Sequence, residues 1–305
     1  MNNLFLGGSI FVAMGLAAGA TVQTAEPKLN PQQYAQDLAK WRAGQEADLK
    51  ADEGFLSVAG LFWLKEGDST IGADSACDVK LPRGAGSGQF GVITRHGESV
   101  TMAIKPGVAV SVKNGAETTP AGTEVQFALD STRVKIGSAT FMAIHRGNRI
   151  GIRLWDKSCK GFTEFKGQKW YAPNPKYIVK AKFVAYDPPK MVDITNVLGD
   201  VQPVTIVGYV EFTVGGKVCR LDAQGAGDGL FMNFKDLTSG NATYPAGRFL
   251  DAPKPIDGVV MIDFNKATNP PCAFTAFATC PLPPRQNFLP VAIPAGEKTH
   301  HPIED

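Results

Sequence analysis

Apolar and polar positions along the chain follow two different periods. Tyr34, Leu38 and Trp41 lie at i, i+4 and i+7 with charged residues between them. The Asn30-Pro31 pair before them is typical of a helix N-cap followed by proline at the first helical position. This pattern predicts one amphipathic helix over residues 30–52, and no other segment has a convincing helical period.

After residue 55 the apolar period changes to two. Short apolar runs recur between turn signals, and residues 140–145 and 149–155 flank Arg146-Gly147-Asn148, a typical hairpin signature. Many short strands at this spacing predict a β-sandwich over residues 55–157. The other predicted strands lie within residues 61–64, 79–81, 100–104, 108–112, 125–129 and 134–136.

A second β-rich domain, a sandwich or barrel, is predicted over residues 175–298, after an irregular connection at residues 158–175. Alternation restarts at residues 177–183, and Asp187-Pro188-Pro189 is expected to end that strand. The clearest hairpin has strands 206–214 and 217–223 around Gly215-Gly216, because glycine adopts the positive φ of a type I′ turn. Further strands are expected at residues 230–234 and 259–264. The last forty residues are rich in proline, which predicts an extended segment wrapped on a sheet.

Composition and charge exclude several classes of protein. The chain has 305 residues, 44% hydrophobic and 20% charged, which is typical of globular domains. A net charge of +2 argues against a nucleic-acid-binding surface. Only four histidines are present, two of them in the last six residues, which argues against a polyhistidine metal site or a histidine-based triad. We therefore expect no metal and no cofactor.

The N-terminus has the pattern of a secretory signal peptide. Residues 1–20 carry no charged side chain, and the apolar run from residue 4 ends in Ala18-Gly19-Ala20, a typical cleavage pattern. An uncleaved anchor is the alternative, but the glycines in the run and its length, near the minimum of about 17 residues for a span, disfavour it. The sequence predicts an exported protein, periplasmic or secreted, with no membrane span after signal cleavage.

Export implies an oxidising compartment, where disulfides persist. Cys272 and Cys280 lie eight residues apart in a proline-rich stretch, and a disulfide between them would close a small loop. The pairing of Cys77, Cys159 and Cys219 stays open. There is no Cys-x-x-Cys pair and no histidine beside a cysteine, which argues against structural zinc.

Polar residues gather within one part of the C-terminal domain. If strand 230–234 neighbours strand 259–264, Asp236, Asp263 and Asn265 meet near the strand ends. Arg248 could then hold a carboxylate or phosphate, and Tyr244 could donate a hydrogen bond or act as an acid. These residues predict a pocket for a small polar or anionic ligand. The predicted lining is Asp236, Tyr244, Arg248, Asp263, Asn265 and Asn269.

Two other interpretations of these residues stay open. They fit a buried structural network, in which residues 236–241 form a turn and Arg248 pairs with Asp263. They also fit a hydrolase with Asp236 or Asp263 as general base and Arg248 as anion holder. No Gly-x-Ser-x-Gly elbow occurs in the sequence, so the catalytic residues are left unassigned.

One local motif resembles the opening of a forkhead-associated domain. It consists of residues 70–82 and Lys113-Asn114-Gly115. Domains of that family are β-sandwiches that bind phosphothreonine peptides through loops. The family has an arginine where this chain has Ala73, and its Ser-x-x-His motif is absent from residues 83–90. The resemblance implies the fold for residues 55–155 and disfavours phosphopeptide binding.

A broader set of motifs resembles the domain of unknown function 1684 family of bacteria and archaea. The similarity runs from about Tyr34 to Lys298 and implies no established reaction. The motifs are Trp63-Leu-x-Glu-Gly67, Asn196-Val-Leu-Gly-Asp200, Thr243-Tyr-Pro-Ala-Gly-Arg-Phe-Leu250, Asp263-Phe-Asn-Lys-Ala-Thr-Asn-Pro-Pro-Cys272, Cys280-Pro-Leu-Pro-Pro284 and Ala295-Gly-Glu297.

Overall fold

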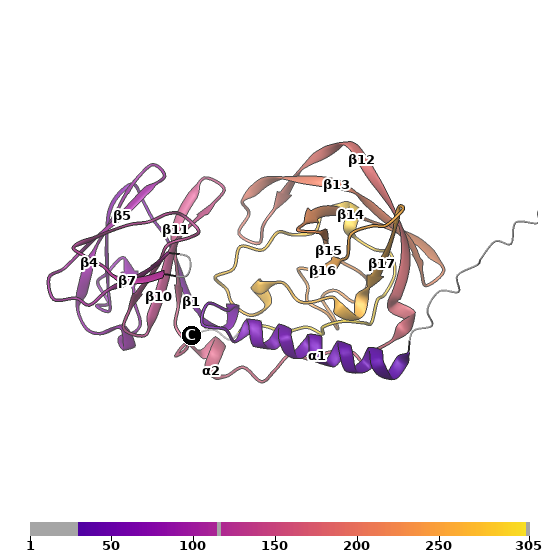
Figure 1. Ribbon diagram of the computed structural model, residues 1–305, viewed down its shortest axis with the longest axis horizontal. Helices are drawn as coiled ribbons and strands as arrows, with labels where there is room; N and C mark the ends of the chain where they lie inside the picture. The colour runs from indigo at the N-terminus through magenta and orange to yellow at the C-terminus, as the bar shows by residue number, and fades with distance from the viewer. Residues whose placement is uncertain (1–29, 115–116, 303–305) are drawn as a thin grey trace, which may run out of the picture.

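The computed structural model describes residues 30–114 and 117–302 and shows two β-rich lobes, with a long helix lying along the C-terminal one (Figure 1). The mainly β fold with one N-terminal helix is therefore confirmed. The predicted signal peptide lies outside the described residues. Within the described part of the chain, no helix is both long and apolar enough to cross a membrane.

Helix α1 spans Pro31–Leu49 and begins where the Asn-Pro pair predicts. The Asn30 side chain accepts hydrogen bonds from two first-turn N–H groups, which have no partner within the helix. Leu38 is fully buried, and Tyr34 and Trp41 are partly buried on the same side. The Tyr34 hydroxyl donates to Asp263 Oδ2 at 2.9 Å, which fixes the start of the helix on the C-terminal lobe.

The N-terminal lobe consists of two sheets with an apolar core between them. Its strands are β1 (Val58–Trp63), β2 (Gly67–Gly72), β3 (Val79–Lys80), β4 (Gln89–His96), β5 (Ser99–Ile104), β6 (Ser111–Asn114), β7 (Glu117–Pro120), β8 (Glu124–Gln126), β9 (Arg133–Ile136), β10 (Ala139–Arg146) and β11 (Arg149–Trp155). One sheet has the order β1-β11-β10-β9-β6-β7 and the other β3-β2-β4-β5-β8. The β10–β11 hairpin turns at Gly147, as predicted.

The C-terminal lobe is built on one strongly curled sheet (Figure 1). A short helix, α2 (Lys160–Thr163), lies in the connection that precedes it. The strands are β12 (Ile178–Thr195), β13 (Val201–Val214), β14 (Lys217–Ala226), β15 (Gly229–Phe234), β16 (Arg248–Ala252) and β17 (Val259–Asp263), in the order β16-β15-β14-β13-β12-β17. The predicted β13–β14 hairpin is confirmed, with φ of +58° at Gly215 and +75° at Gly216.

One strand differs from its prediction. The Asp-Pro-Pro sequence at residues 187–189 does not end the strand, and β12 continues through it to Thr195. The register with β13 shifts between Ala185 and Lys190. Both prolines fall inside this irregularity, where the strand does not need to supply ladder N–H groups.

Residues 264–302 cross the C-terminal lobe in extended form with short 3₁₀ turns and isolated bridges. Alternate side chains at Leu289, Val291, Ile293 and Ala295 enter the apolar core formed with the sheet. Residues 264–302 are called the C-terminal wrap below. Because its alternate side chains are apolar and buried, the wrap is a part of the core.

Candidate functional site

The six predicted ligand-binding residues do not form one pocket. The prediction required strands β15 and β17 to be neighbours, but β15 lies between β14 and β16, whereas β17 pairs with β12. Two strands that are close in sequence thus lie at different positions in the sheet. The predicted residues consequently separate into four groups with different surroundings.

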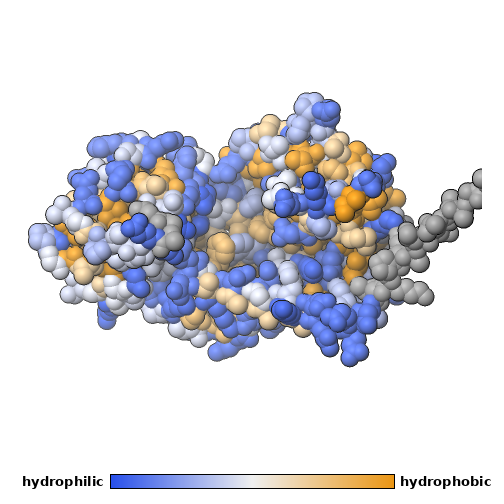
Figure 2. All heavy atoms as spheres, in the orientation of Figure 1, coloured by the Kyte–Doolittle hydropathy of each residue, from blue (hydrophilic) through white to orange (hydrophobic). Residues whose placement is uncertain are grey.

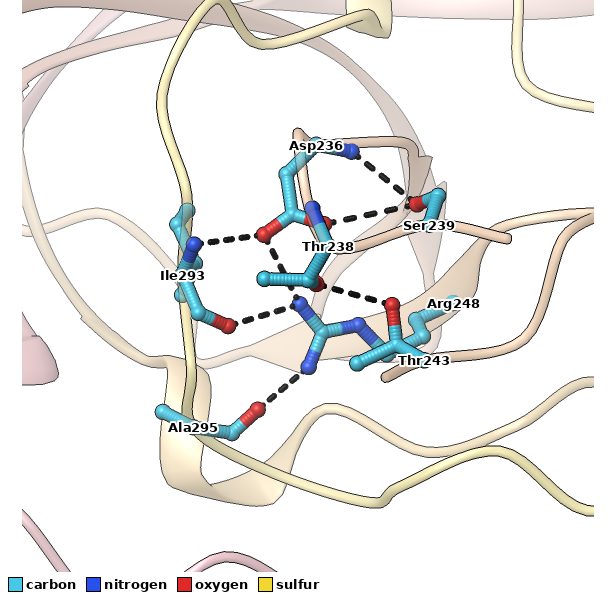
Figure 3. Close-up of polar contacts among 7 residues, drawn as sticks. All are labelled: Asp236, Thr238, Ser239, Thr243, Arg248, Ile293 and Ala295. Atoms are coloured by element: carbon cyan, nitrogen blue, oxygen red, sulfur yellow. Dashed lines mark hydrogen bonds and ion pairs between the residues drawn. The ribbon is translucent and has the colours of Figure 1, made fainter. Parts of the chain in front are cut away.

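Asp236 and Arg248 form a fully buried ion pair (Figure 3). Arg248 Nη2 lies 3.3 Å from Asp236 Oδ2 and donates to the Ile293 carbonyl at 3.1 Å. Arg248 Nη1 donates to the Ala295 carbonyl. Asp236 Oδ2 accepts the Ile293 N–H at 2.6 Å, and Oδ1 accepts the Thr238 hydroxyl at 2.7 Å. Both side chains are inaccessible and hold the C-terminal wrap, which corrects their assignment to a ligand pocket.

Asp263 and Asn265 lie next to the start of α1. Asp263 accepts the Tyr34 hydroxyl and, at 3.0 Å, the backbone N–H of Asn265. The Asn265 side chain accepts the Asn174 N–H at 2.8 Å and donates to the Asn174 carbonyl at 2.9 Å. These contacts join the helix, the inter-lobe connection and the end of β17, so this pair also has a structural role.

Tyr244 contacts the predicted disulfide partners. Its hydroxyl donates to the Cys272 carbonyl at 2.8 Å, and burial raises the pKa of Tyr244, so the phenol stays protonated. The Cys272 N–H lies 3.2 Å from Cys280 Sγ, and a hydrogen bond from the Cys280 thiol lowers the pKa of Cys272. Both cysteines are buried free thiols in the structure, so their disulfide stays a prediction.

Asn269 lines a cavity. The cavity has a volume of about 300 Å³, near the lower end for small-molecule sites, and lies between the end of α1, residues 53–55 and the C-terminal lobe. Its apolar wall is Leu49, Phe55, Phe249, Pro271 and Phe274; its polar wall is Gln45, Asp48, Glu53, Gln168, Thr268 and Asn269. No lysine or arginine is part of this described lining.

Three buried oxygen atoms next to this cavity accept no well-formed hydrogen bond among the described residues, although the side chains of Gln168 and Asn269 lie close enough to the Glu297 carboxyl group to lower its pKa. They are Glu297 Oε1, Gln168 Oε1 and Asn269 Oδ1. Asn269 Nδ2 donates to the Lys298 carbonyl at 2.8 Å, which fixes the orientation of the amide. The Asn269 N–H donates to Glu297 Oε2 at 2.7 Å, so the carboxyl group lies directly behind the lining. Unpaired buried acceptors cost roughly 1–3 kcal/mol each, and such a group needs an explanation.

The site analysis of the sequence missed Glu297. Burial raises the pKa of Glu297 to about 7. The period-two pattern that buries Leu289, Val291, Ile293 and Ala295 places Glu297 on the same inward face. A carboxyl residue at the next inward position of an alternating apolar segment is a sequence signal that could have identified Glu297.

Fold and cavity together define a two-lobed, mainly β protein with a small cavity beside its N-terminal helix. Residues 163–298 match the model of a family described as "Protein of unknown function (DUF1684)". This part of the chain belongs to that family, as its motifs predict, while the Trp63 motif lies outside the matched residues. The match covers the sheet, nearly all of the wrap and half of the cavity lining, and it names no activity.

A solved structure also matches. It is the solution NMR structure of an uncharacterized protein of Haloarcula marismortui, with 33% sequence identity and a TM-score of 0.38. The match covers 45% of this chain and 78% of that chain. No curated protein matches the chain.

The Asp236–Arg248 pair predicts a large cost for Arg248→Met. Removing one partner leaves a buried charge without compensation, which typically costs about 3–5 kcal/mol. We expect a loss of this size in the free energy of unfolding, measured by urea denaturation. The control is Arg220→Met, which breaks an exposed pair with Glu211 and should cost about 1 kcal/mol or less. A loss of similar size in both variants would contradict the structural role of Arg248.

The carboxyl group of Glu297 predicts a pH-dependent stability. Its pKa is about 7 when folded against an ordinary value of 4.5, so over this interval the folded protein keeps a proton that the unfolded chain has released. Stability contributed by this group is therefore lost as pH rises through 7, by about 3 kcal/mol. Glu297→Gln keeps an acceptor for the Asn269 N–H and removes the titration. Urea unfolding at pH 5 and pH 8.5 should show this loss in the wild type and not in the variant; equal pH profiles would exclude it.

Proposed function

We propose that this protein is exported and binds a small polar molecule in the cavity beside the end of α1. The observation that carries the proposal is the group of three unpaired buried oxygens at a cavity of about 300 Å³ with a largely aromatic wall. Apolar walls with a few convergent polar groups are typical of small-molecule sites. A protonated Glu297 can donate to only one of these oxygens, so a ligand that supplies hydrogen-bond donors would satisfy the others.

The lining favours a neutral or cationic ligand over an anionic one. Asp48 contributes a carboxylate, whereas the Glu53 carboxylate is paired with Arg133 at 2.8 Å. The amide oxygens of Gln168 and Asn269 accept no well-formed hydrogen bond from the described residues. The aromatic faces of Phe249 and Phe274 add favourable surface for an apolar or cationic group. A hydroxyl- or amine-bearing molecule matches this set of contacts.

The geometry gives the hydrolase alternative no support at the residues first considered. A general base has to reach the proton that it abstracts. Asp236 is inaccessible and paired with Arg248, and Asp263 is held by Tyr34 and Asn265. We therefore propose a binding role without catalysis.

The phosphopeptide alternative rests only on the local resemblance to forkhead-associated domains. Ala73 stands where that family carries its phosphate-binding arginine. Without that guanidinium the loop lacks the charge-assisted hydrogen bonds that hold a phosphate. We expect phosphothreonine peptides not to bind near Asn114.

Filling the cavity tests the binding proposal. Gln45 lines the cavity from α1, whereas Gln36 lies exposed on the same helix away from it. The protein purified from its exported compartment is analysed by native mass spectrometry for a bound small molecule, which is then identified and titrated by calorimetry. We expect Gln45→Trp to weaken binding at least tenfold and Gln36→Trp to leave it unchanged. No bound molecule, or equal affinity in both variants, would contradict the proposal.

Export and the proposed Cys272–Cys280 disulfide have a common test. The intact mass of exported protein should correspond to a chain beginning at Thr21, with two hydrogens fewer than the fully reduced chain. Peptide mapping without reductant should link Cys272 to Cys280, and Cys272→Ser should leave Cys280 as a free thiol. An uncleaved N-terminus would exclude signal cleavage, and two free thiols in exported protein would exclude the disulfide.

A further inference from the structure

We propose that Arg153 binds a small oxyanion, a carboxylate or phosphate group, at the seam between the two lobes. Arg153 does not line the cavity beside α1, so this site is independent of the function proposed above. The inference rests on the position of Arg153, its burial without a direct partner, and the pairing of the nearby Asp130 carboxylate with Arg146.

Arg153 lies on the face of its sheet that meets the C-terminal lobe. In β11 it is in register with Leu61 of β1 and Met142 of β10. Met142 belongs to an apolar cluster against which Phe277 of the C-terminal lobe packs. Phe277 belongs to the loop between Cys272 and Cys280, and this loop also reaches the N-terminal sheet through a hydrogen bond from the Thr275 hydroxyl to the Val58 carbonyl at 3.4 Å. The space-filling view shows the molecule hollowed between the two lobes (Figure 2).

The guanidinium group of Arg153 has no ion pair and no hydrogen bond within the described part of the chain. The residue is only 7% exposed, and its Nε is a buried donor without a partner. Burial lowers the pKa of Arg153, but an arginine remains charged at any physiological pH. Asp130 attracts Arg153 without pairing with it. A buried cation that lacks a direct ion pair is costly, so an anion at this position would be bound favourably.

Two carboxylates at the β10–β11 hairpin are paired with arginines other than Arg153. Asp130 accepts from Arg146 at 2.7 Å. Asp200 accepts from Arg149 and, at 3.0 Å, from the Asn196 amide. The three arginines of the β10–β11 hairpin therefore share two carboxylates, and one positive charge is left at Arg153.

Cys280 does not compete with an anion for Arg153. It lies close enough to interact with Arg153, but it supplies no negative charge, because hydrogen bonding to Cys272 and burial raise the pKa of its thiol and a disulfide with Cys272 has no ionisable group. The planar guanidinium of Arg153 provides paired N–H donors that match the geometry of carboxylate and phosphate.

The test uses the full chain with two anions as probes, sodium phosphate and sodium malonate. Binding is measured by calorimetry and by the thermal unfolding midpoint, at an ionic strength held constant with sodium chloride. We expect saturable binding of at least one probe and a raised midpoint. Binding of phosphate alone would identify a phosphoryl ligand, and binding of malonate alone a carboxylate ligand.

Variants assign the binding to Arg153. Arg153→Met removes the charge and keeps much of the stem, and should lower the affinity at least tenfold without lowering the unfolding midpoint in the absence of anion. Arg153→Lys keeps the charge without the planar donors, and an intermediate affinity is expected. It also serves as the test if the Met variant fails to fold. Arg220→Met removes an exposed arginine outside the seam and should bind as the wild type does. No binding of either probe, or equal affinity in the wild type and both Arg153 variants, would overturn the proposal.

Discussion

The buried pair of Asp236 and Arg248 is the contact on which the C-terminal lobe depends. Arg248 begins β16 opposite Phe234, the last residue of β15, and its guanidinium reaches two carbonyl groups of the wrap. Asp236 accepts the N–H of Ile293 from the other side. The backbone of the wrap bonds to Lys235 and Leu237 as far as Val291. Beyond that point the charged pair satisfies the backbone groups of Ile293 and Ala295. The charges are retained because each has partners that an apolar pair would leave unsatisfied.

The same contact positions the floor of the candidate ligand cavity. Two residues after Ala295 the chain reaches Glu297, whose N–H donates to the Ala267 carbonyl at 2.8 Å and whose carboxylate accepts the Asn269 N–H. Gly296 permits this turn, because it has φ of +80° and a Cβ there would lie 2.6 Å from the Ala267 carbonyl oxygen. The wrap thus brings the Glu297 carboxyl group and the Asn269 amide together, next to the Gln168 amide of the inter-lobe connection. The unpaired oxygens at this place carry the binding proposal.

The sequence predicts the elements better than their arrangement. The helix start at Asn30, the turns at Gly147 and Gly215, and the mainly β class follow from local chemistry, and the structure confirms them. The order of strands depends on tertiary contacts, so the assumed pairing of β15 with β17 was wrong and the predicted pocket separated into four groups. The polar residues beside apolar strands were predicted to line a pocket. In the structure Asp236 and Arg248 form a buried ion pair instead, whereas Asn269 lines a cavity. Glu297 was missed because the sequence analysis predicted no strand in the wrap and did not use the alternation of buried residues from Leu289 to Ala295.

Hydrogen exchange of the Ile293 amide tests most directly whether the wrap belongs to the core. This N–H is bonded to the buried Asp236 carboxylate at 2.6 Å, so its exchange should require opening of the whole lobe. We predict protection equal to that of the β15 amides, such as Met232, which lies at the centre of the same core. Exchange at the rate of an exposed loop, with β15 still protected, would contradict the role assigned to the Asp236–Arg248 pair and to the cavity floor that it positions.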